Sequence, residues 1–302
     1  MFMSHFSGYA PVNTRNAYLY QLCRQHSGQL VVTMFLFYSG YGIFVSFQNK
    51  GMSYVSRFPV NRVLKVLLHF DIAVAIYIVM QFLRGQVFGV QKIILSLLAW
   101  DTVGNSNWYI FAMIILYLIT WMTLSAFGER KLEGLLGITT MTILSMYFLS
   151  IFKDGYWYNT MLCYPAGMWY AFFQKKIEAG LKDKKIYIWS LFCILLIFIM
   201  CYRIRTNIIW YSLWGLAFSL GVVLFTMKVE MKNRILEWTG KNLFGLYIMQ
   251  RIPMILLQHT VLAEKHVYAY AAVCLIFMYI LGYLLEKLCL MMDGLIFKKE
   301  IS

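Results

Sequence analysis

Eight long apolar runs decide what this chain can fold into. They cover residues 30–47, 63–83, 108–127, 135–152, 186–202, 207–227, 243–262 and 267–287. A helix needs about 20 mostly apolar residues to cross the hydrocarbon core of a bilayer, and most of these runs approach that length. Because only helices and closed barrels satisfy their backbone polar groups inside lipid, the runs predict an all-α, polytopic transmembrane helical bundle.

The low charge content supports a membrane environment. Of 302 residues, 61% are hydrophobic and 13% are charged, with a mean hydropathy of +0.65, whereas about a quarter of a soluble domain is charged. A net charge of +14 is also typical of nucleic-acid-binding proteins. Here, however, the basic residues lie in short clusters between apolar runs, as in the loops of membrane proteins. We therefore expect the lipid bilayer as a partner and no nucleic acid.

Two shorter segments complete the expected path of the chain. Residues 159–173, which contain Pro165 and Gly167, must also cross if the loop charges are to alternate, which gives about eight or nine spans. Residues 93–100 are too few to cross and indicate a re-entrant or interfacial piece. The six cysteines show no spacing typical of disulfides or metal sites, so no metal is predicted. The oligomeric state is left open.

The basic residues of the loops predict the topology. If the loop 48–62 is cytoplasmic, 18 of the 27 Lys and Arg residues fall inside and eight outside, which follows the positive-inside rule. This arrangement predicts a multi-pass protein of the plasma membrane with a cytoplasmic C-terminus. Residues 1–29 are then an extracytoplasmic N-terminal segment, expected to be the tail of a first span upstream of Met1. Residues 30–302 are the transmembrane domain.

Five short motifs occur in a fixed order along the chain. They are Ser39-Gly40-Tyr41 within MFLFYSGYGI, Arg57-Phe58 with Asn61-Arg62, Asn107-Trp108-Tyr109-Ile110, Cys163-Tyr164-Pro165-Ala166-Gly167, and Gly240-Lys241-Asn242-Leu243 followed by Leu246-Tyr247-Ile248. As an ordered set they resemble acyltransferase family three, the multi-pass membrane O-acyltransferases that modify cell-surface polysaccharides and related glycans. The resemblance covers most of residues 30–302 and lacks most of the family's first span.

The resemblance implies a reaction and its partners. An acetyl or other acyl group would move from cytoplasmic acyl-CoA, with acetyl-CoA as the expected donor, to a hydroxyl of an extracytoplasmic polysaccharide or glycolipid. His5 matches the catalytic histidine of the family's first span, whereas the arginine that precedes it there would lie upstream of Met1. A histidine of a late span is replaced by Gln250. An inactive, truncated family member is therefore an alternative.

Acyl transfer to a hydroxyl needs a general base, a site for the acyl donor and groups that stabilise the oxyanion. His5 is the candidate base, because imidazole titrates near neutral pH. Ser39 and Tyr41 are candidates for contacting the acyl-donor arm, although small residues there also suit simple helix packing. Arg57 and Arg62 are candidates for binding the donor's phosphates, and ordinary positive-inside anchoring is the alternative.

Charged residues within spans are expensive and usually functional. Arg251 lies within the run 243–262, and with Asn107 and Trp108 it is predicted to contact substrate or line its channel. An alternative for Arg251 is structural neutralisation by Asp71. We expect His5 at the mouth of a pocket lined by Ser39, Tyr41 and Arg251.

A transporter or flippase of a lipid-linked sugar is the rival function. Such proteins often contain paired inverted repeats, and no second copy of the segment 39–42 is present.

Overall fold

The computed structural model describes residues 1–10 and 18–297, and every regular element in these ranges is helical. Three residues of the charge count, Arg15, Lys298 and Lys299, lie outside the described residues, as does the C-terminal residue Ser302. The elements in chain order are α1 (Phe2–Phe6), α2 (Tyr18–Lys50), α3 (Met52–Ser56), the π-helix η1 (Pro59–Leu64), α4 (Lys65–Leu83), α5 (Val90–Leu97), α6 (Trp108–Phe127), α7 (Lys131–Phe152), the 3-10 helix η2 (Gly155–Trp157), α8 (Cys163–Gly180), α9 (Lys184–Ile204), α10 (Ile208–Thr226), α11 (Arg234–Lys241), α12 (Leu243–Met249), α13 (Arg251–Leu257), α14 (Val261–Lys265) and α15 (Val267–Ile296).

Seven helical segments among the described residues are long and apolar enough to cross a membrane. They are Ser27–Lys50, Pro59–Leu83, Trp108–Phe127, Lys131–Phe152, Lys184–Ile204, Ile208–Thr226 and Val267–Ile296. The chain is therefore a multi-pass membrane protein, and the prediction of an all-α polytopic helical bundle is confirmed. The side of the membrane on which each loop lies stays a prediction.

The two remaining predicted crossings have a different character. The apolar part of α8 is short, because its second half carries Gln174, Lys175, Lys176 and Glu178. The run 243–262 is divided at Gln250 into α12 and α13, which together form a shorter apolar segment, and α14 follows. The segment 93–100 contributes to the short helix α5, in line with its expected inability to cross.

The helices form two compact units. The first unit comprises Met1–Gly28, Leu64–Phe111 and Lys232–Ser302, and the second comprises Gln29–Val63 and Ala112–Met231. Each unit therefore gathers segments that lie far apart in the sequence.

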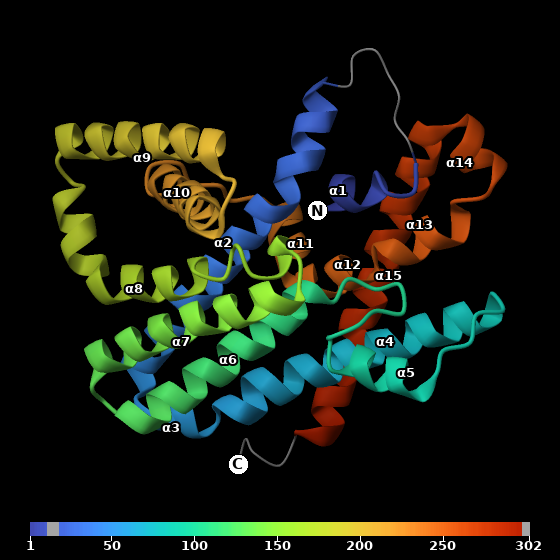
Figure 1. The fold of residues 1–302 in the computed structure, drawn as a ribbon, viewed down its shortest axis with the longest axis horizontal. Helices are drawn as coiled ribbons and strands as arrows, with labels where there is room; N and C mark the ends of the chain where they lie inside the picture. The colour runs from blue at the N-terminus through green and yellow to red at the C-terminus, as the bar shows by residue number, and fades with distance from the viewer. Residues whose placement is uncertain (11–17, 298–302) are drawn as a thin grey trace. The chain divides into compact units, whose positions relative to one another are not determined.

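In the first unit, α12 packs closely against α15 (Figure 1). The two helices approach at Gly245 and Gly282, where a Cβ on Gly245 would overlap the Gly282 carbonyl. The Glu286 carboxylate of α15 accepts a hydrogen bond of 2.9 Å from the Gly245 backbone N–H. Small residues allow this backbone approach, which is how helices pack in lipid.

In the second unit, glycines also allow a close backbone approach where α2 packs against α8. A Cβ on Gly40 would overlap the Tyr164 carbonyl, and a Cβ on Gly167 would overlap the Phe37 carbonyl. Each helix thus presents a glycine to the backbone of the other. Glycine lowers the stability of an isolated helix, and this close approach explains why glycine occurs at both positions. In the same unit α9 packs extensively on α10 (Figure 1).

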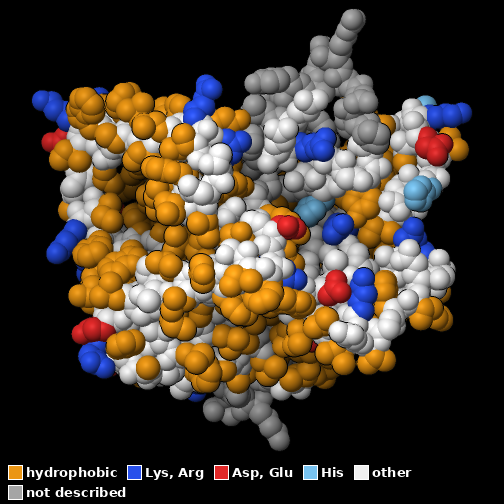
Figure 2. All heavy atoms as spheres, viewed as in Figure 1, with side chains coloured by type: hydrophobic (Ala, Val, Ile, Leu, Met, Phe, Trp, Pro, Cys, Tyr) orange, Lys and Arg blue, Asp and Glu red, His pale blue; other side chains and the backbone are white. Residues whose placement is uncertain are grey.

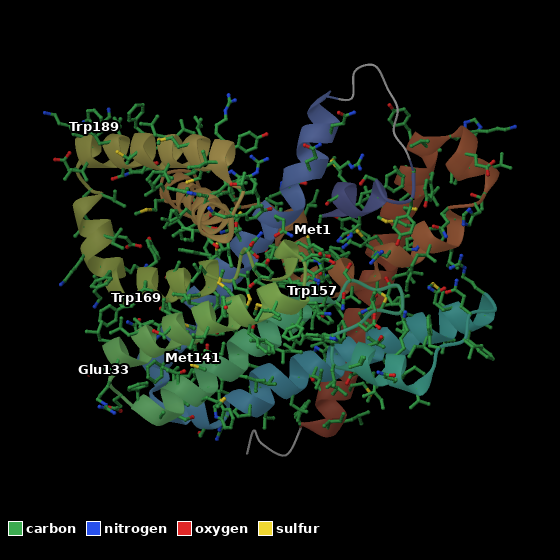
Figure 3. All side chains as sticks on the ribbon, viewed as in Figure 1. Met1, Glu133, Met141, Trp157, Trp169 and Trp189 are labelled. Carbon is green, nitrogen blue, oxygen red and sulfur yellow. The ribbon has the colours of Figure 1, made fainter. Side chains whose placement is uncertain are left out.

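The outer surface of the second unit is apolar. Figure 2 shows hydrophobic side chains over the visible faces of α7, α9 and α10. Trp189, labelled on α9 in Figure 3, projects outward with 65% of its surface exposed. In contrast, Trp169 of α8 points toward α7, where its indole N–H donates to Thr139 Oγ1 at 3.0 Å. The exposed apolar faces suit contact with lipid tails rather than water.

We predict that Gly167→Ala destabilises the second unit. The added methyl group would push α8 away from the Phe37 carbonyl, and overpacking of this kind costs about 1–3 kcal/mol. The melting temperature of the detergent-purified protein should fall. Gly180→Ala is the matched control, because it lies at the other end of α8 with no atom near the new Cβ. Equal melting temperatures for the two variants would contradict the proposed close crossing.

Candidate active site

Arg251 organises a polar cluster in the first unit. It is the first residue of α13, at the break after Gln250. Its Nε donates to the Tyr9 hydroxyl at 2.9 Å, and Nη1 donates to the Asn105 carbonyl at 3.2 Å. The guanidinium also lies 5.7 Å from the centre of the Tyr9 ring, within the range of a cation–π contact. The charge is thus held by neutral oxygens and an aromatic face.

The N-terminal helix α1 reaches this cluster through its apolar side. Phe6 is 3% exposed and lies 4.8 Å from the ring of Tyr270 on α15, while Phe2 stacks on Phe6 at 5.5 Å. Tyr270 in turn donates to the Met254 carbonyl of α13 at 2.7 Å. These contacts place α1 beside α13 (Figure 1) and bring His5 and Tyr9 toward Arg251.

His5 is half-buried and close enough to Arg251 to feel its charge. Burial, the positive charge of Arg251 and the positive charge of the N-terminal amine together lower the pKa of His5 to about 4, with burial as the largest cause. Its ordinary pKa is about 6.5. The imidazole is therefore neutral at pH 7 and able to accept a proton. Of the predicted pocket residues, the structure brings His5 and Arg251 together.

Three buried polar atoms near Arg251 have no hydrogen-bond partner among the described residues. They are Asn105 Nδ2, Ser106 Oγ and the Tyr247 hydroxyl. The hydroxyls of Ser106 and Tyr247 lie close enough to interact with one another. An unpaired buried donor costs about 1–3 kcal/mol, so native proteins rarely keep several together without a ligand or water to satisfy them. These groups are therefore candidates for contact with a bound molecule.

The loop 99–107 is fixed by its own hydrogen bonds. The Asn107 side-chain nitrogen donates to the carbonyls of Ala99 and Asp101, both at 2.9 Å. Thr102 Oγ1 donates to the Asn105 carbonyl at 2.6 Å. Asn107 therefore holds the loop that presents Asn105 to Arg251. Trp108 is the first residue of α6 and contacts the ring of Tyr109, so substrate contacts of Asn107 and Trp108 stay predictions.

The structural alternative for Arg251 is wrong, because no Asp71–Arg251 ion pair forms among the described residues. Asp71 Oδ1 is buried without a hydrogen-bond partner in the same part of the chain. His69 instead contacts Asp293 of α15 at 3.0 Å, and Lys65 contacts the same carboxylate at 3.5 Å. These pairs connect α4 to α15 within the first unit.

A second polar cluster surrounds Arg62 in the second unit. Arg62 Nε donates to the Tyr54 hydroxyl at 3.3 Å, and the hydroxyls of Tyr117 and Tyr164 lie within its electrostatic reach. Tyr117 shares a 3.1 Å hydrogen bond with Ser39 Oγ. The structure therefore brings the candidates Arg62 and Ser39 into one tyrosine-lined cluster.

The other two donor-site candidates lie differently. Tyr41 donates to Gln174 Oε1 at 3.0 Å, and Gln174 Nε2 donates to Glu178 at 2.8 Å. Arg57 is exposed in the connection between α3 and η1. Ser39 and Tyr41 belong to the second unit, whereas His5 and Arg251 belong to the first. The pocket expected to join these four residues stays a prediction.

Most of the tyrosines in both clusters, together with Ser106, are not among the site residues predicted from the sequence. Tyr9, Tyr54 and Tyr117 each contribute a hydroxyl to one of the two clusters. A usable signal was present, because a tyrosine within an apolar run must find a partner for its hydroxyl when it is buried. The identity of the partner, however, depends on tertiary packing.

We predict that His5 titrates near pH 4 and that Arg251→Gln moves this midpoint upward, because a repelling charge is removed. The titration midpoint is measured by NMR of the histidine side chains in the detergent-purified protein. The His5→Gln variant identifies the His5 signal, because that signal is missing from its spectrum. In the unfolded chain His5 binds a proton below about pH 6.5, whereas in the folded chain it does so only below about pH 4. Between these two values the unfolded state binds more protons, so the free energy of unfolding also decreases as the pH falls through this range. A His5 midpoint near 6.5 in both proteins would contradict this environment.

Comparison with known proteins supports the motif-based resemblance. Residues 1–287 match the profile described as the acyltransferase domain of family three. No curated protein matches significantly, and no solved structure does either. The matched region contains His5, Arg62 and Arg251, and with them both polar clusters. The match spans nearly the whole chain, and the protein therefore belongs to acyltransferase family three.

Proposed function

We propose that this membrane acyltransferase moves an acetyl group from cytoplasmic acetyl-CoA to a hydroxyl of an extracytoplasmic polysaccharide or glycolipid. The plasma membrane is the proposed location, with the C-terminus in the cytoplasm. The observation that carries the proposal is the cluster in the first unit, where a neutral imidazole lies beside a guanidinium and unpaired buried donors. Such a set suits acyl transfer, which needs a base and an electrostatic site for the oxyanion.

His5 acts as the general base in this proposal. Its neutral imidazole accepts the proton of the acceptor hydroxyl while the hydroxyl oxygen attacks the thioester carbonyl carbon. The carbon–sulfur bond then breaks, and the departing thiolate receives the proton, so that an ester and free CoA are formed. The lowered pKa keeps His5 unprotonated throughout the physiological range. The same shift makes its conjugate acid a strong donor toward the leaving group.

Arg251 and its neighbours would stabilise the negative charge that develops on the carbonyl oxygen. Tyr9 and the Asn105 carbonyl hold the guanidinium in place before any substrate arrives. The Asn105 amide nitrogen, which no described residue satisfies, and the neighbouring hydroxyls of Ser106 and Tyr247 are further donors in this proposal. Preorganised donors of this kind are typically the largest electrostatic contribution to acyl transfer.

The acyl donor is assigned to the second unit. Arg62 and Arg57 are proposed to bind the phosphates of acetyl-CoA, since guanidinium groups form bidentate hydrogen bonds with phosphate. Ser39 and Tyr41 are proposed to contact the donor arm. The hydrogen bonds of Arg62 to Tyr54 and of Ser39 to Tyr117 support this assignment, because they hold both side chains in defined positions.

We predict that His5→Ala lowers the rate of CoA release in the presence of glycan acceptor by about 100-fold or more, the usual effect of removing a general base. The purified full-length chain is given acetyl-CoA, and the freed thiol is measured. His259→Ala is the matched control, because His259 is exposed and lies outside both clusters. Equal loss in both variants, or none in either, would contradict the assigned role of His5.

We predict that Arg62→Ala and Arg57→Ala each weaken the binding of acetyl-CoA. Loss of a hydrogen bond to a charged group costs about 1.5–3 kcal/mol, which corresponds to roughly a ten- to hundred-fold rise in Kd. Calorimetric titration of the purified variants measures the affinity. Arg130→Ala removes an exposed cation of the same unit and should leave the affinity unchanged. If the affinity is unchanged in all three variants, the two arginines anchor the loop and do not bind the donor.

A further inference from the structure

A side cavity in the second unit lies apart from both polar clusters. It has a volume of about 540 Å³, within the range typical of small-molecule sites. Its lining comes from the second half of α7, the connection to α8 and the first turns of α10. The lining includes Ile143, Met146, Tyr147, Ser150, Ile209 and Ser212.

The cavity has a closed floor and an open side. Met146 and Ser212 are each 3% exposed and form part of the floor. Ile143, Tyr147 and Ile209 are 51%, 70% and 63% exposed and lie at the rim. The rim is continuous with the exposed apolar surface of α7. In a multi-pass membrane protein such a surface faces lipid, so the cavity opens toward the hydrocarbon of the bilayer.

The chemistry of the lining selects a hydrocarbon occupant. Both serine hydroxyls are engaged by the backbone, since Ser150 Oγ donates to the Tyr147 carbonyl at 2.7 Å and Ser212 Oγ donates to the Asn159 carbonyl at 2.8 Å. The remaining side chains are aliphatic or aromatic apart from the Met146 thioether, and the hydroxyls of Tyr147 and Tyr158 are the other polar groups of the lining. A sugar would lose its hydrogen bonds with water on entering and gain few in return. An alkyl chain makes no hydrogen bonds with water and therefore loses none on entering the cavity.

Two basic residues lie close in sequence to the ends of α7 and α10, the helices that line the cavity. Lys153 follows the last residue of α7, and its Nζ lies 4.3 Å from the centre of the Trp157 ring, which is labelled in Figure 3. Arg205 precedes α10, and its guanidinium lies over the rings of Tyr202 and Trp214, 3.8 and 5.3 Å from their centres.

The charge at this end of the unit is positive. Residues 153–162 and 203–207 carry three cations, Lys153, Arg203 and Arg205, against one carboxylate, Asp154. Lys153 and Arg205 each lie three residues from a lining residue, Ser150 and Ile208 respectively. Because α7 and α9 are apolar up to this point, these cations lie at the level where a span ends and lipid headgroups begin.

We infer that this cavity binds a hydrocarbon chain of an anionic phospholipid, whose phosphate is held at the rim by Lys153 and Arg205. The apolar lining accepts the chain, and the neighbouring cations account for the preference for a negative headgroup. The second unit thus carries a lipid site that is independent of the acyl-transfer chemistry.

Native mass spectrometry of the detergent-purified full chain tests this site, with phosphatidylglycerol and phosphatidylcholine as probes. The wild-type chain should retain phosphatidylglycerol in preference to phosphatidylcholine. The double variant Ile143→Trp with Ile209→Trp fills the opening and should lose most of the retained phosphatidylglycerol. The matched control is Ile151→Trp with Ile188→Trp, two exposed positions of α7 and α9 outside the lining, and it should bind as the wild type does.

A second pair of variants tests the headgroup. Lys153→Gln with Arg205→Gln should reduce retention of phosphatidylglycerol several-fold, to the level of phosphatidylcholine, with an unchanged elution profile on gel filtration. Unaltered retention in the cavity-filling variant, or an equal loss in its control, would overturn the site. A preference for phosphatidylglycerol that survives loss of both cations would overturn the assigned headgroup.

Discussion

A guanidinium carried by an otherwise apolar helical segment has to be fully held by the protein, and the first unit is built around that requirement. An arginine in a span costs about 2.5–3.5 kcal/mol on insertion scales before any partner is found. Arg251 meets this cost with Tyr9, which comes from the N-terminal segment, and with the Asn105 carbonyl, which comes from the loop before α6. One side chain therefore connects three distant parts of the sequence. The same contacts place His5 beside a positive charge.

The two units solve the problem of packing in lipid in the same way. Paired glycines let α12 approach α15 in the first unit, and α2 approach α8 in the second. Close backbone contact replaces the hydrophobic driving force that is weak between helices surrounded by lipid. Several buried tyrosine and serine hydroxyls in each unit pair with one another or with backbone carbonyls. Among the described residues, much of the outer face of the second unit is apolar, and near Arg251 the buried Asn105 amide nitrogen has no hydrogen-bond partner.

The fold class could be predicted because apolar runs of span length have few alternatives in a membrane. The division of 243–262 into α12 and α13 was not predicted, although the polar pair Gln250 and Arg251 interrupts the run there and Pro253 lacks the backbone donor that a continuous helix would need. Recognition of the family motifs singled out His5 and Arg62, and Arg251 followed from the cost of charge in a span. Their partners were out of reach, since the packing of Phe6 on Tyr270 and the hydrogen bond of Tyr9 to Arg251 join residues far apart in the sequence. Asp71 shows the limit of what charge alone can predict. Its opposite charge suggested an ion pair with Arg251, whereas the folded chain gives Arg251 the neutral partners Tyr9 and Asn105.

Transfer of an acyl group across the bilayer is the central claim, and sealed proteoliposomes test it most directly. Acetyl-CoA labelled in the acetyl group is supplied on one side, and a glycan acceptor is enclosed on the other. The account predicts that alkali-labile acetyl ester accumulates on the enclosed glycan while an equal amount of free CoA stays outside, and that His5→Ala abolishes both. Movement of the glycan across the membrane without ester formation or CoA release would contradict the account and would identify a transporter instead.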